Sequence, residues 1–149
     1  MSSITPKFLK PGDKIMLVAP ARFALPVTIQ DATSAVLAAG FTPVIPPGLA
    51  LRDHQFAGSD SHRVDHLNSA FSDQTIRAVF ALRGGYGCGR LLPFLNSSAY
   101  KTDPTWIIGF SDITVLHSWS TNLGIKSLHA PVASTLSSTL TADVEALWS

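Results

Sequence analysis

Ser111 is the residue whose setting most strongly indicates chemistry. The apolar run Trp106–Ile108 leads into Gly109, and a segment with helical spacing begins after the serine. This order predicts a strand, a sharp turn and a helix, with the serine hydroxyl lifted out of the strand. Backbone N–H groups at the start of such a helix can stabilise a developing negative charge. We therefore predict that Ser111 is a catalytic nucleophile.

The local pattern also allows a plainer interpretation of this serine. The nucleophile turn of α/β hydrolases has the form G-x-S-x-G, and Ile113 stands where the second glycine is required. Gly109 and Ser111 therefore match half of that motif. A serine also commonly caps the helix that follows it, and from the pattern alone Ser111 could do only that.

A glycine-rich loop, Arg83–Arg90, follows another apolar run. The G-x-x-x-x-G spacing from Gly84 resembles a phosphate-binding loop, but Arg90 and Leu91 stand where that loop needs Lys and then Ser or Thr. A dinucleotide-binding pattern that starts at Gly85 fails as well, because its last position is Arg90. Neither nucleotide motif is therefore supported.

Two other interpretations of this loop stay open. It could be a tight turn that needs glycine at positive φ. Its backbone amides could also point at a substrate oxygen and form an oxyanion site beside Ser111. Cys88 within the loop has no local acid–base partner, so we interpret it as a small apolar filler.

The histidines do not complete a site by sequence. His62 and His66 lie four residues apart on a predicted helix, a spacing that could present two metal ligands. No further His or Cys cluster adds ligands, so we predict no metal and no cofactor. His117 lies about one and a half helical turns beyond the proposed nucleophile and is expected to pack away from it. His129 could approach the site or be structural, and nothing supports a role for His54.

Short apolar runs alternate with helical patterns along the chain. We predict strands over 14–20, 42–46, 76–82, 105–109 and 127–132, and helices over 29–39, 60–71, 91–95 and 112–123, the first capped by Thr28. This alternation predicts an α/β fold in three layers, a mainly parallel sheet flanked by helices, flavodoxin-like or doubly wound. Ligands of such sheets bind beyond the carboxyl ends of the strands, where the glycine loop and Ser111 both fall.

Composition and charge exclude several classes of protein. With 149 residues, 46% hydrophobic and 14% charged, the chain is expected to form a globular core. A net charge of +1 gives no electrostatic reason to expect nucleic acid or an anionic membrane as partner. The single cysteine excludes an internal disulfide, and no apolar run approaches the roughly 20 residues that span a bilayer. Without a signal-peptide pattern, we predict a cytoplasmic protein.

The chain divides into two parts by composition. Residues 1–132 are predicted to be the α/β domain that carries the nucleophile. Residues 133–149 are predicted to be a linker rich in Ser and Thr, followed by a helix from Thr141 that begins a further domain. Because the sequence stops inside a helical pattern, we expect it to be part of a longer protein.

The chain resembles the N-terminal half of the LD-carboxypeptidases, serine peptidase family S66, which include muramoyltetrapeptide carboxypeptidases and microcin C self-immunity proteins. The most specific match is the pair formed by RGGYG at 83–87 and G-F-S-D-I-T at 109–114. Further matching residues are Leu9–Asp13, Val18–Pro20, Ala57, Gly58, Asp60, Arg63, Ala70, Phe71, Asp73, Arg90–Leu92, Val115, Leu116, His129 and Pro131. Departures from the usual family residues occur at Ala21, Cys88, Gly89 and Asn96, and each could alter a substrate contact.

The resemblance implies an acyl-transfer mechanism. Ser111 would attack the carbonyl of an amide between an L- and a D-amino acid near the C-terminus of a peptide. Backbone N–H groups of Gly85 and Asp112 would hold the oxyanion. The family's Glu and His come from a C-terminal domain that this sequence does not contain, so we assign no base here. The substrate-binding residues expected from the same motif are Arg83, Gly84 and Tyr86.

The expected function is therefore that of a cytoplasmic serine carboxypeptidase, which removes the terminal D-alanine from murein tetrapeptide during cell-wall recycling. Two alternatives are kept. One is hydrolysis of peptidyl or aminoacyl nucleotide conjugates, as in the immunity branch of the family. The other is a non-catalytic α/β module that binds an anion with the glycine loop. Members of the family often form dimers, and whether this protein is a homodimer is left open.

Overall fold

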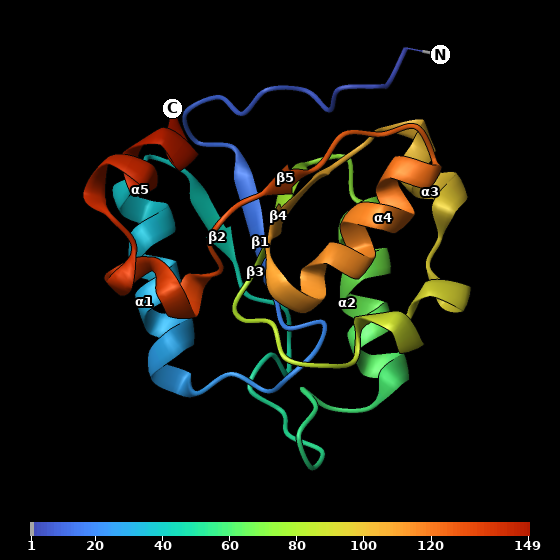
Figure 1. The fold of residues 1–149 in the computed structure, drawn as a ribbon, viewed down its shortest axis with the longest axis horizontal. Coiled ribbons are helices and arrows are strands. Elements are labelled where there is room, and N and C mark those ends of the chain that lie inside the picture. Colours follow the sequence, from blue (N-terminus) through green and yellow to red (C-terminus); the bar gives the residue numbers. More distant parts are fainter. Residues whose placement is uncertain (1) are drawn as a thin grey trace.

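Five parallel strands form one sheet in the computed structural model, which describes residues 2–149 (Figure 1). The strands are β1 (Lys14–Val18), β2 (Thr42–Val44), β3 (Ile76–Ala81), β4 (Trp106–Gly109) and β5 (Leu128–His129). Their order across the sheet is β2-β1-β3-β4-β5, and every pair is parallel. This is the flavodoxin-like order, so the predicted fold class is confirmed.

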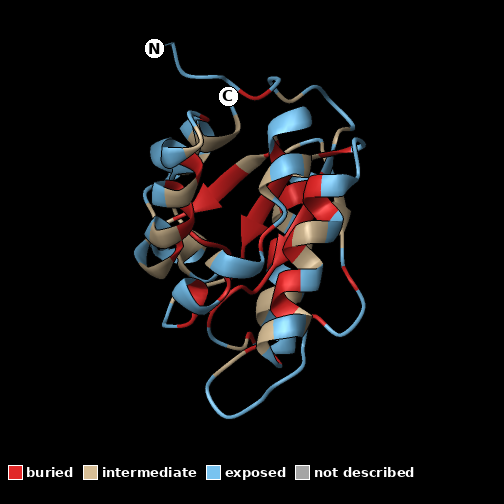
Figure 2. Cartoon of the chain, turned by 90° about the vertical axis from the view of Figure 1, so that its right-hand side faces the viewer, coloured by how far each residue is buried: buried red, intermediate tan, exposed pale blue. Residues whose placement is uncertain are grey.

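Helices cover both faces of the sheet. One face carries α2 (Asp60–Ser72), α3 (Ser97–Thr102) and α4 (Thr114–Asn122), and the other carries α1 (Pro26–Ala38) and α5 (Thr141–Trp148) (Figure 1). Alternate strand residues enter the two cores: Met16 and Val18 face the first, whereas Ile15 and Leu17 face the second. Figure 2 shows the buried strands between helices whose outer surfaces are exposed. Because the central strands are buried on both faces, they are continuous apolar runs in the sequence.

The start of the first helix differs from the prediction. Helix α1 begins at Pro26, and its N-cap residue Leu25 makes no side-chain capping bond. Thr28 therefore lies inside the helix, and the predicted cap at this residue is wrong. The physical reason is that proline fixes φ near its helical value and lacks the N–H that the first turn cannot satisfy.

The segment between β3 and β4 also differs from the prediction. The helix expected over 91–95 is reduced to a short 3₁₀ helix, because the chain becomes extended at Leu95 before Asn96 caps the next helix. Helix α3 was not predicted, although Asn96 gives the signal for it: its side chain accepts a hydrogen bond from the N–H of Ala99. This segment contains the 3₁₀ helices η1 (Cys88–Arg90) and η2 (Leu92–Phe94).

The C-terminal segment packs onto the sheet. The part predicted to be a linker contains the 3₁₀ helix η4 (Ala133–Ser138), whose first residue is buried and whose Ser134 N–H donates to the carbonyl of Leu82 at 2.8 Å. In α5, Trp148 meets Phe80 edge to face, with ring centroids 5.5 Å apart. The composition rich in Ser and Thr therefore gave a wrong prediction for residues 133–140, because η4 packs against α1 and bonds Leu82 directly after β3. The helix from Thr141 is confirmed, and a domain boundary after residue 132 stays a prediction.

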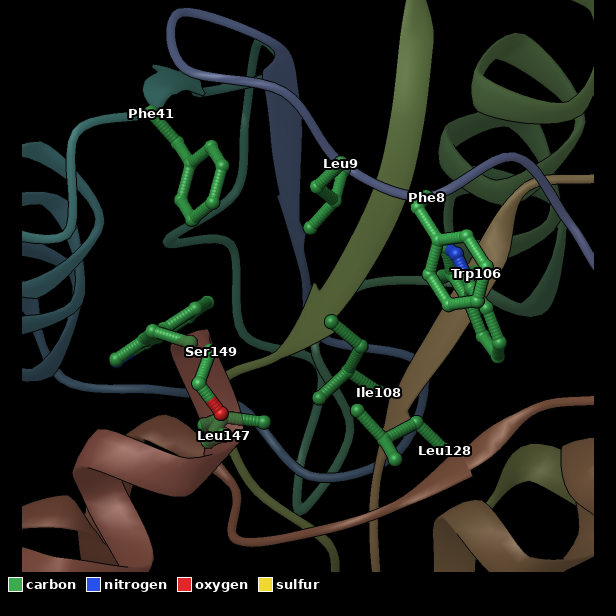
Figure 3. A pocket seen from close by; sticks show the side chains of 9 residues that line it. Phe8, Leu9, Phe41, Trp106, Ile108, Leu128, Leu147 and Ser149 are labelled. Atoms are coloured by element: carbon green, nitrogen blue, oxygen red, sulfur yellow. The ribbon is translucent and has the colours of Figure 1, made fainter.

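An apolar hollow of about 220 Å³ lies near the amino ends of the strands (Figure 3). It is lined by Phe8, Leu9, Phe41, Trp106, Ile108, Leu128, Leu147, Trp148 and Ser149. None of these side chains is acidic or basic, so they cannot supply a general acid or base. The glycine loop and Ser111 lie at the opposite, carboxyl edge of the sheet.

None of the helices within residues 2–149 combines the length and the apolar character needed to cross a bilayer.

Candidate active site

Ser111 stands at the turn between β4 and the helices that follow it. Its backbone has φ of 62°, in the left-handed region, and its side chain is exposed. The 3₁₀ helix η3 (Ser111–Ile113) begins at the serine and leads directly into α4. A non-glycine residue at such a φ costs about 1–2 kcal/mol and persists only where the surroundings impose it. The predicted strand, sharp turn and helix are therefore present, and the turn holds the serine in a strained conformation.

The structure does not support the alternative in which Ser111 only caps a helix. The N-cap residue of η3 is Phe110, and no side chain caps this end. Within residues 2–149, the hydroxyl of Ser111 has no hydrogen-bond partner. The residue is exposed, so the donor and acceptor capacity of this hydroxyl is free for a ligand.

The glycine loop packs directly against this serine. A Cβ atom placed on Gly84 would lie 2.9 Å from the Cβ and 3.0 Å from the Oγ of Ser111. Gly85 and Gly87 have φ of 117° and 139°, so the loop is also the positive-φ turn that the sequence allowed. The two loops line one edge because β3 and β4 are neighbours in the sheet. Both interpretations that stayed open for this loop are therefore compatible with its structure.

Two backbone N–H groups flank the serine. The N–H of Gly85 has no acceptor within residues 2–149, and that of Asp112 belongs to the first helical turn, where N–H groups lack intrahelical partners. The Asp112 carboxylate accepts a hydrogen bond from the N–H of Cys88 at 2.9 Å, which ties the glycine loop to the helix start. This arrangement is suited to receive negative charge beside Ser111, and the oxyanion role of Gly85 and Asp112 stays a prediction.

A buried arginine connects the loops of the site. Arg63 on α2 is 2% exposed, and its guanidinium donates to the carbonyls of Pro20, at 2.7 Å, and Gly87, at 3.2 Å. It also pairs with Asp60, which in turn pairs with Arg90. Arg90, and to a smaller extent Arg63, hold the pKa of Asp60 below its ordinary value. In the sequence, Arg63 was noted only as a residue that matches the family. The local signal for its burial is a charged residue on the apolar face of a helix.

Residues 15–130 match the family Peptidase_S66, described as the LD-carboxypeptidase N-terminal domain. The chain belongs to this family. It is 38% identical over 125 residues to the murein tetrapeptide carboxypeptidase of Pseudomonas aeruginosa, an alignment that covers 83% of this chain and 40% of that protein. The matched range contains both the glycine loop and Ser111.

Solved structures of similar proteins share the fold. The MccF-like protein from Bacillus anthracis is 27% identical with a TM-score of 0.82, covering 89% of this chain and 42% of that one. Muramoyltetrapeptide carboxypeptidase from Oxalobacter formigenes is 26% identical with a TM-score of 0.73, covering 80% and 40%. This S66 chain thus spans less than half the length of these relatives.

His117 supports the turn in this S66 domain from behind. The side chain is buried, as predicted, but it contacts the turn: Nε2 lies 2.8 Å from the carbonyl oxygen of Gly109. Because a carbonyl can only accept, Nε2 carries the proton, and Nδ1 of the neutral ring accepts from the hydroxyl of Ser127 at 2.7 Å. The imidazole is therefore committed to holding the strand end that precedes Ser111.

The neutral state of His117 gives a testable pH dependence. Burial lowers the pKa of His117, so the unfolded chain takes up this proton first as the pH falls below about 6.5. We expect the free energy of unfolding to decrease from about pH 7.5 to about pH 5.5, and His117→Gln to make this decrease smaller. Burial also lowers the pKa of His66, which accounts for part of the remaining slope. Urea unfolding of both proteins across this range measures the slopes, and identical slopes would contradict the assignment.

The other histidines and the cysteine considered as site residues have structural contacts. Nε2 of His62 lies 3.0 Å from the carbonyl oxygen of Gly48, and Nε2 of His66 lies 2.9 Å from that of Pro47. Both histidines thus fasten the loop after β2. In the part of the chain that the structure describes, no three His, Cys, Asp or Glu residues are grouped to hold a metal ion. Cys88 is fully buried, and burial, together with the Asp112 carboxylate, raises the pKa of its thiol.

The residues expected to contact substrate lie at the same edge of the sheet. Arg83 is half-buried directly after β3, and Tyr86 is 59% exposed with its ring centroid 6.2 Å from that of Phe56. Gly84 packs against Ser111. Arg83 and Tyr86 flank the glycine pair of this loop, and the contacts of all three residues with substrate stay predictions.

Proposed function

We propose that this chain is the nucleophile-bearing part of a serine LD-carboxypeptidase, which releases the terminal D-alanine from a murein tetrapeptide. The observation that carries the proposal is the exposed Ser111 at φ of 62°, packed against Gly84. Membership of the S66 family and the murein tetrapeptide carboxypeptidase of Pseudomonas aeruginosa support the choice of reaction. We further propose that the enzyme acts in the cytoplasm on peptides recovered from the cell wall.

The proposed reaction is an acyl transfer in two steps. The Oγ of Ser111 attacks the carbonyl of the L,D-amide while its proton passes to a general base. The N–H groups of Gly85 and Asp112 hold the negative oxygen of the tetrahedral intermediate. The intermediate collapses when the C–N bond breaks, and the amine of D-alanine takes the proton from the base. Water, activated by the same base, then hydrolyses the acyl-enzyme and restores the serine.

We propose that the base and its acidic partner lie outside these 149 residues. Within residues 2–149, no histidine is hydrogen-bonded to the hydroxyl of Ser111, and His117 is held by Gly109 and Ser127. The family resemblance implies a histidine oriented by a glutamate from a C-terminal domain. The complete protein is this chain together with the residues that supply this pair.

The test is to assay the 149-residue chain and the complete protein on a tetrapeptide with a terminal L,D-amide. A serine without its base is a weak nucleophile, so we expect turnover by the chain alone to be lower by a factor of about 10³ or more. D-Alanine release measured by coupled oxidation gives both rates. Robust release by the chain alone would overturn the proposed origin of the base.

The complete protein also distinguishes the proposed reaction from the two alternative functions. If the complete protein spares the tetrapeptide but hydrolyses an aminoacyl sulfamoyl adenosine, the substrate is a nucleotide conjugate. If a fluorophosphonate labels no serine in the complete protein, the chain is a binding module. Labelling at Ser111 together with D-alanine release is the result that we expect.

A further inference from the structure

The arginines of this chain fall into two groups by their partners. Arg63, Arg77 and Arg90 each form an ion pair with an aspartate. Within residues 2–149, no carboxylate lies within ion-pair distance of Arg22, Arg52 or Arg83. These three follow β1, β2 and β3 in the chain, so all lie in loops after the carboxyl ends of strands. The three arginines without an ion pair thus lie at the edge of the sheet that carries Ser111.

Arg22 lies directly against the glycine loop. Its N–H donates to the carbonyl of Gly84 at 3.4 Å, and a Cβ atom on Gly85 would lie 2.8 Å from the Cβ and 3.6 Å from the Cδ of Arg22. Because Ser111 packs against Gly84, the serine and the arginine contact successive residues of one loop. The stem of Arg22 therefore runs past the residue whose N–H is proposed to hold the oxyanion.

The guanidinium of Arg22 is accessible to a ligand. The residue is exposed, and its guanidinium carbon lies 5.5 Å from the centroid of the Phe23 ring. The guanidinium carbon of Arg52 lies 4.0 Å from the same centroid. Two guanidinium groups thus share one aromatic ring, and neither has a carboxylate of residues 2–149 within ion-pair distance. Such an arrangement favours a bound anion, and the planar fork of arginine matches a carboxylate with two parallel hydrogen bonds.

We propose that Arg22 binds the terminal carboxylate of the peptide substrate, an inference that rests on the proposed function. A carboxypeptidase must recognise a carboxylate one residue beyond the carbonyl that it attacks, a separation of about 3.5 Å along the chain. Arg22 contacts Gly85 and the serine contacts Gly84, so the two side chains lie beside successive residues of one loop. An internal peptide bond offers no charge at that position, so Arg22 restricts cleavage to the last residue of the peptide. Arg52 adds positive charge beside it.

The test measures binding separately from turnover. In the complete protein carrying Ser111→Ala, calorimetry gives the Kd of the tetrapeptide with a free carboxylate and of the same peptide ending in an amide. We expect Arg22→Gln to weaken binding of the carboxylate peptide by about 10- to 100-fold and to leave binding of the amide peptide unchanged. Arg22→Lys restores part of the affinity, because it keeps the charge but loses the fork. Lys126→Gln, an exposed cation after α4, is the matched control and changes neither Kd.

The other outcomes contradict either the role of Arg22 or the proposed function, and the two failures are distinguishable. Unchanged affinity in Arg22→Gln, equal weakening for both peptides, or absence of binding by the parent overturns the role of Arg22. The proposed function fails separately, when the protein with Ser111 intact releases no D-alanine while affinity for the carboxylate peptide still depends on Arg22. In that case the carboxylate site stands and the reaction is wrong.

Discussion

Replacing Ser111 with alanine in the complete protein is expected to lower kcat for D-alanine release by about 10⁴-fold or more. The substitution removes the oxygen that attacks the amide carbonyl in the proposed reaction, and residual catalysis then comes from bound water and the oxyanion donors. Because the hydroxyl is exposed and makes no hydrogen bond within residues 2–149, its loss leaves packing intact. D-Alanine release and thermal unfolding, measured on the same preparation, test both statements.

Ser118→Ala is the matched control for this prediction. Ser118 is exposed on α4, seven residues after the proposed nucleophile, so the change deletes the same atom from the same region. We expect it to retain the activity of the parent. Retained activity in Ser111→Ala would place the nucleophile elsewhere, and a large fall in melting temperature would show that this hydroxyl supports the fold.

Ser111→Gly tests whether the backbone at position 111 is strained, independently of the loss of the nucleophile. Ser111→Gly should also be inactive, but it places at φ of 62° the residue that adopts this conformation without a Cβ clash. We expect Ser111→Gly to be more stable than Ser111→Ala by about 1 kcal/mol. Equal stability of the two variants would contradict the interpretation that the turn stores strain.

Gly84→Ala is expected to lower kcat/KM by about 100-fold, the cost of displacing a reacting group by about 1 Å. The new Cβ would lie 2.9 Å from the Cβ of Ser111, so the serine or the loop must move. The backbone of Gly84 is outside the positive-φ region, so alanine is not strained there for its own sake. The loss therefore reports the contact between the glycine loop and the serine. Kinetics on the tetrapeptide and the rate of fluorophosphonate labelling measure it.

Gly89→Ala provides the comparison within the same loop. Gly89 is also outside the positive-φ region, and a Cβ atom placed on it meets no atom within 4 Å. We expect this variant to keep the kcat/KM and the labelling rate of the parent. If Gly84→Ala behaved in the same way, the close packing of Gly84 on Ser111 would have no part in catalysis.

Local sequence patterns determined the elements and the position of the turn. Continuous apolar runs predict strands buried on both faces, and the residues around Ser111 predict a turn between strand and helix, because these features depend on neighbours in the chain. The fold class followed from their alternation. The same local reasoning failed at Thr28, where proline decided the start of the helix, and at 91–95, where the chain becomes extended at Leu95. It also failed at 133–140, where composition concealed packing against α1 and a hydrogen bond to Leu82.

Only the tertiary structure decided which groups meet at the site. Arg63 bonds the carbonyl of Pro20, 43 residues away, and Arg22 reaches Gly85 because β1 and β3 pair in the sheet. His117 was expected to pack away from the turn, yet its ring holds the carbonyl of Gly109. No local periodicity encodes such contacts, since they depend on strand order and on the angle at which each helix crosses the sheet. The sequence by itself therefore determined the nucleophile candidate and its turn, whereas folding determined the charges and supports around it.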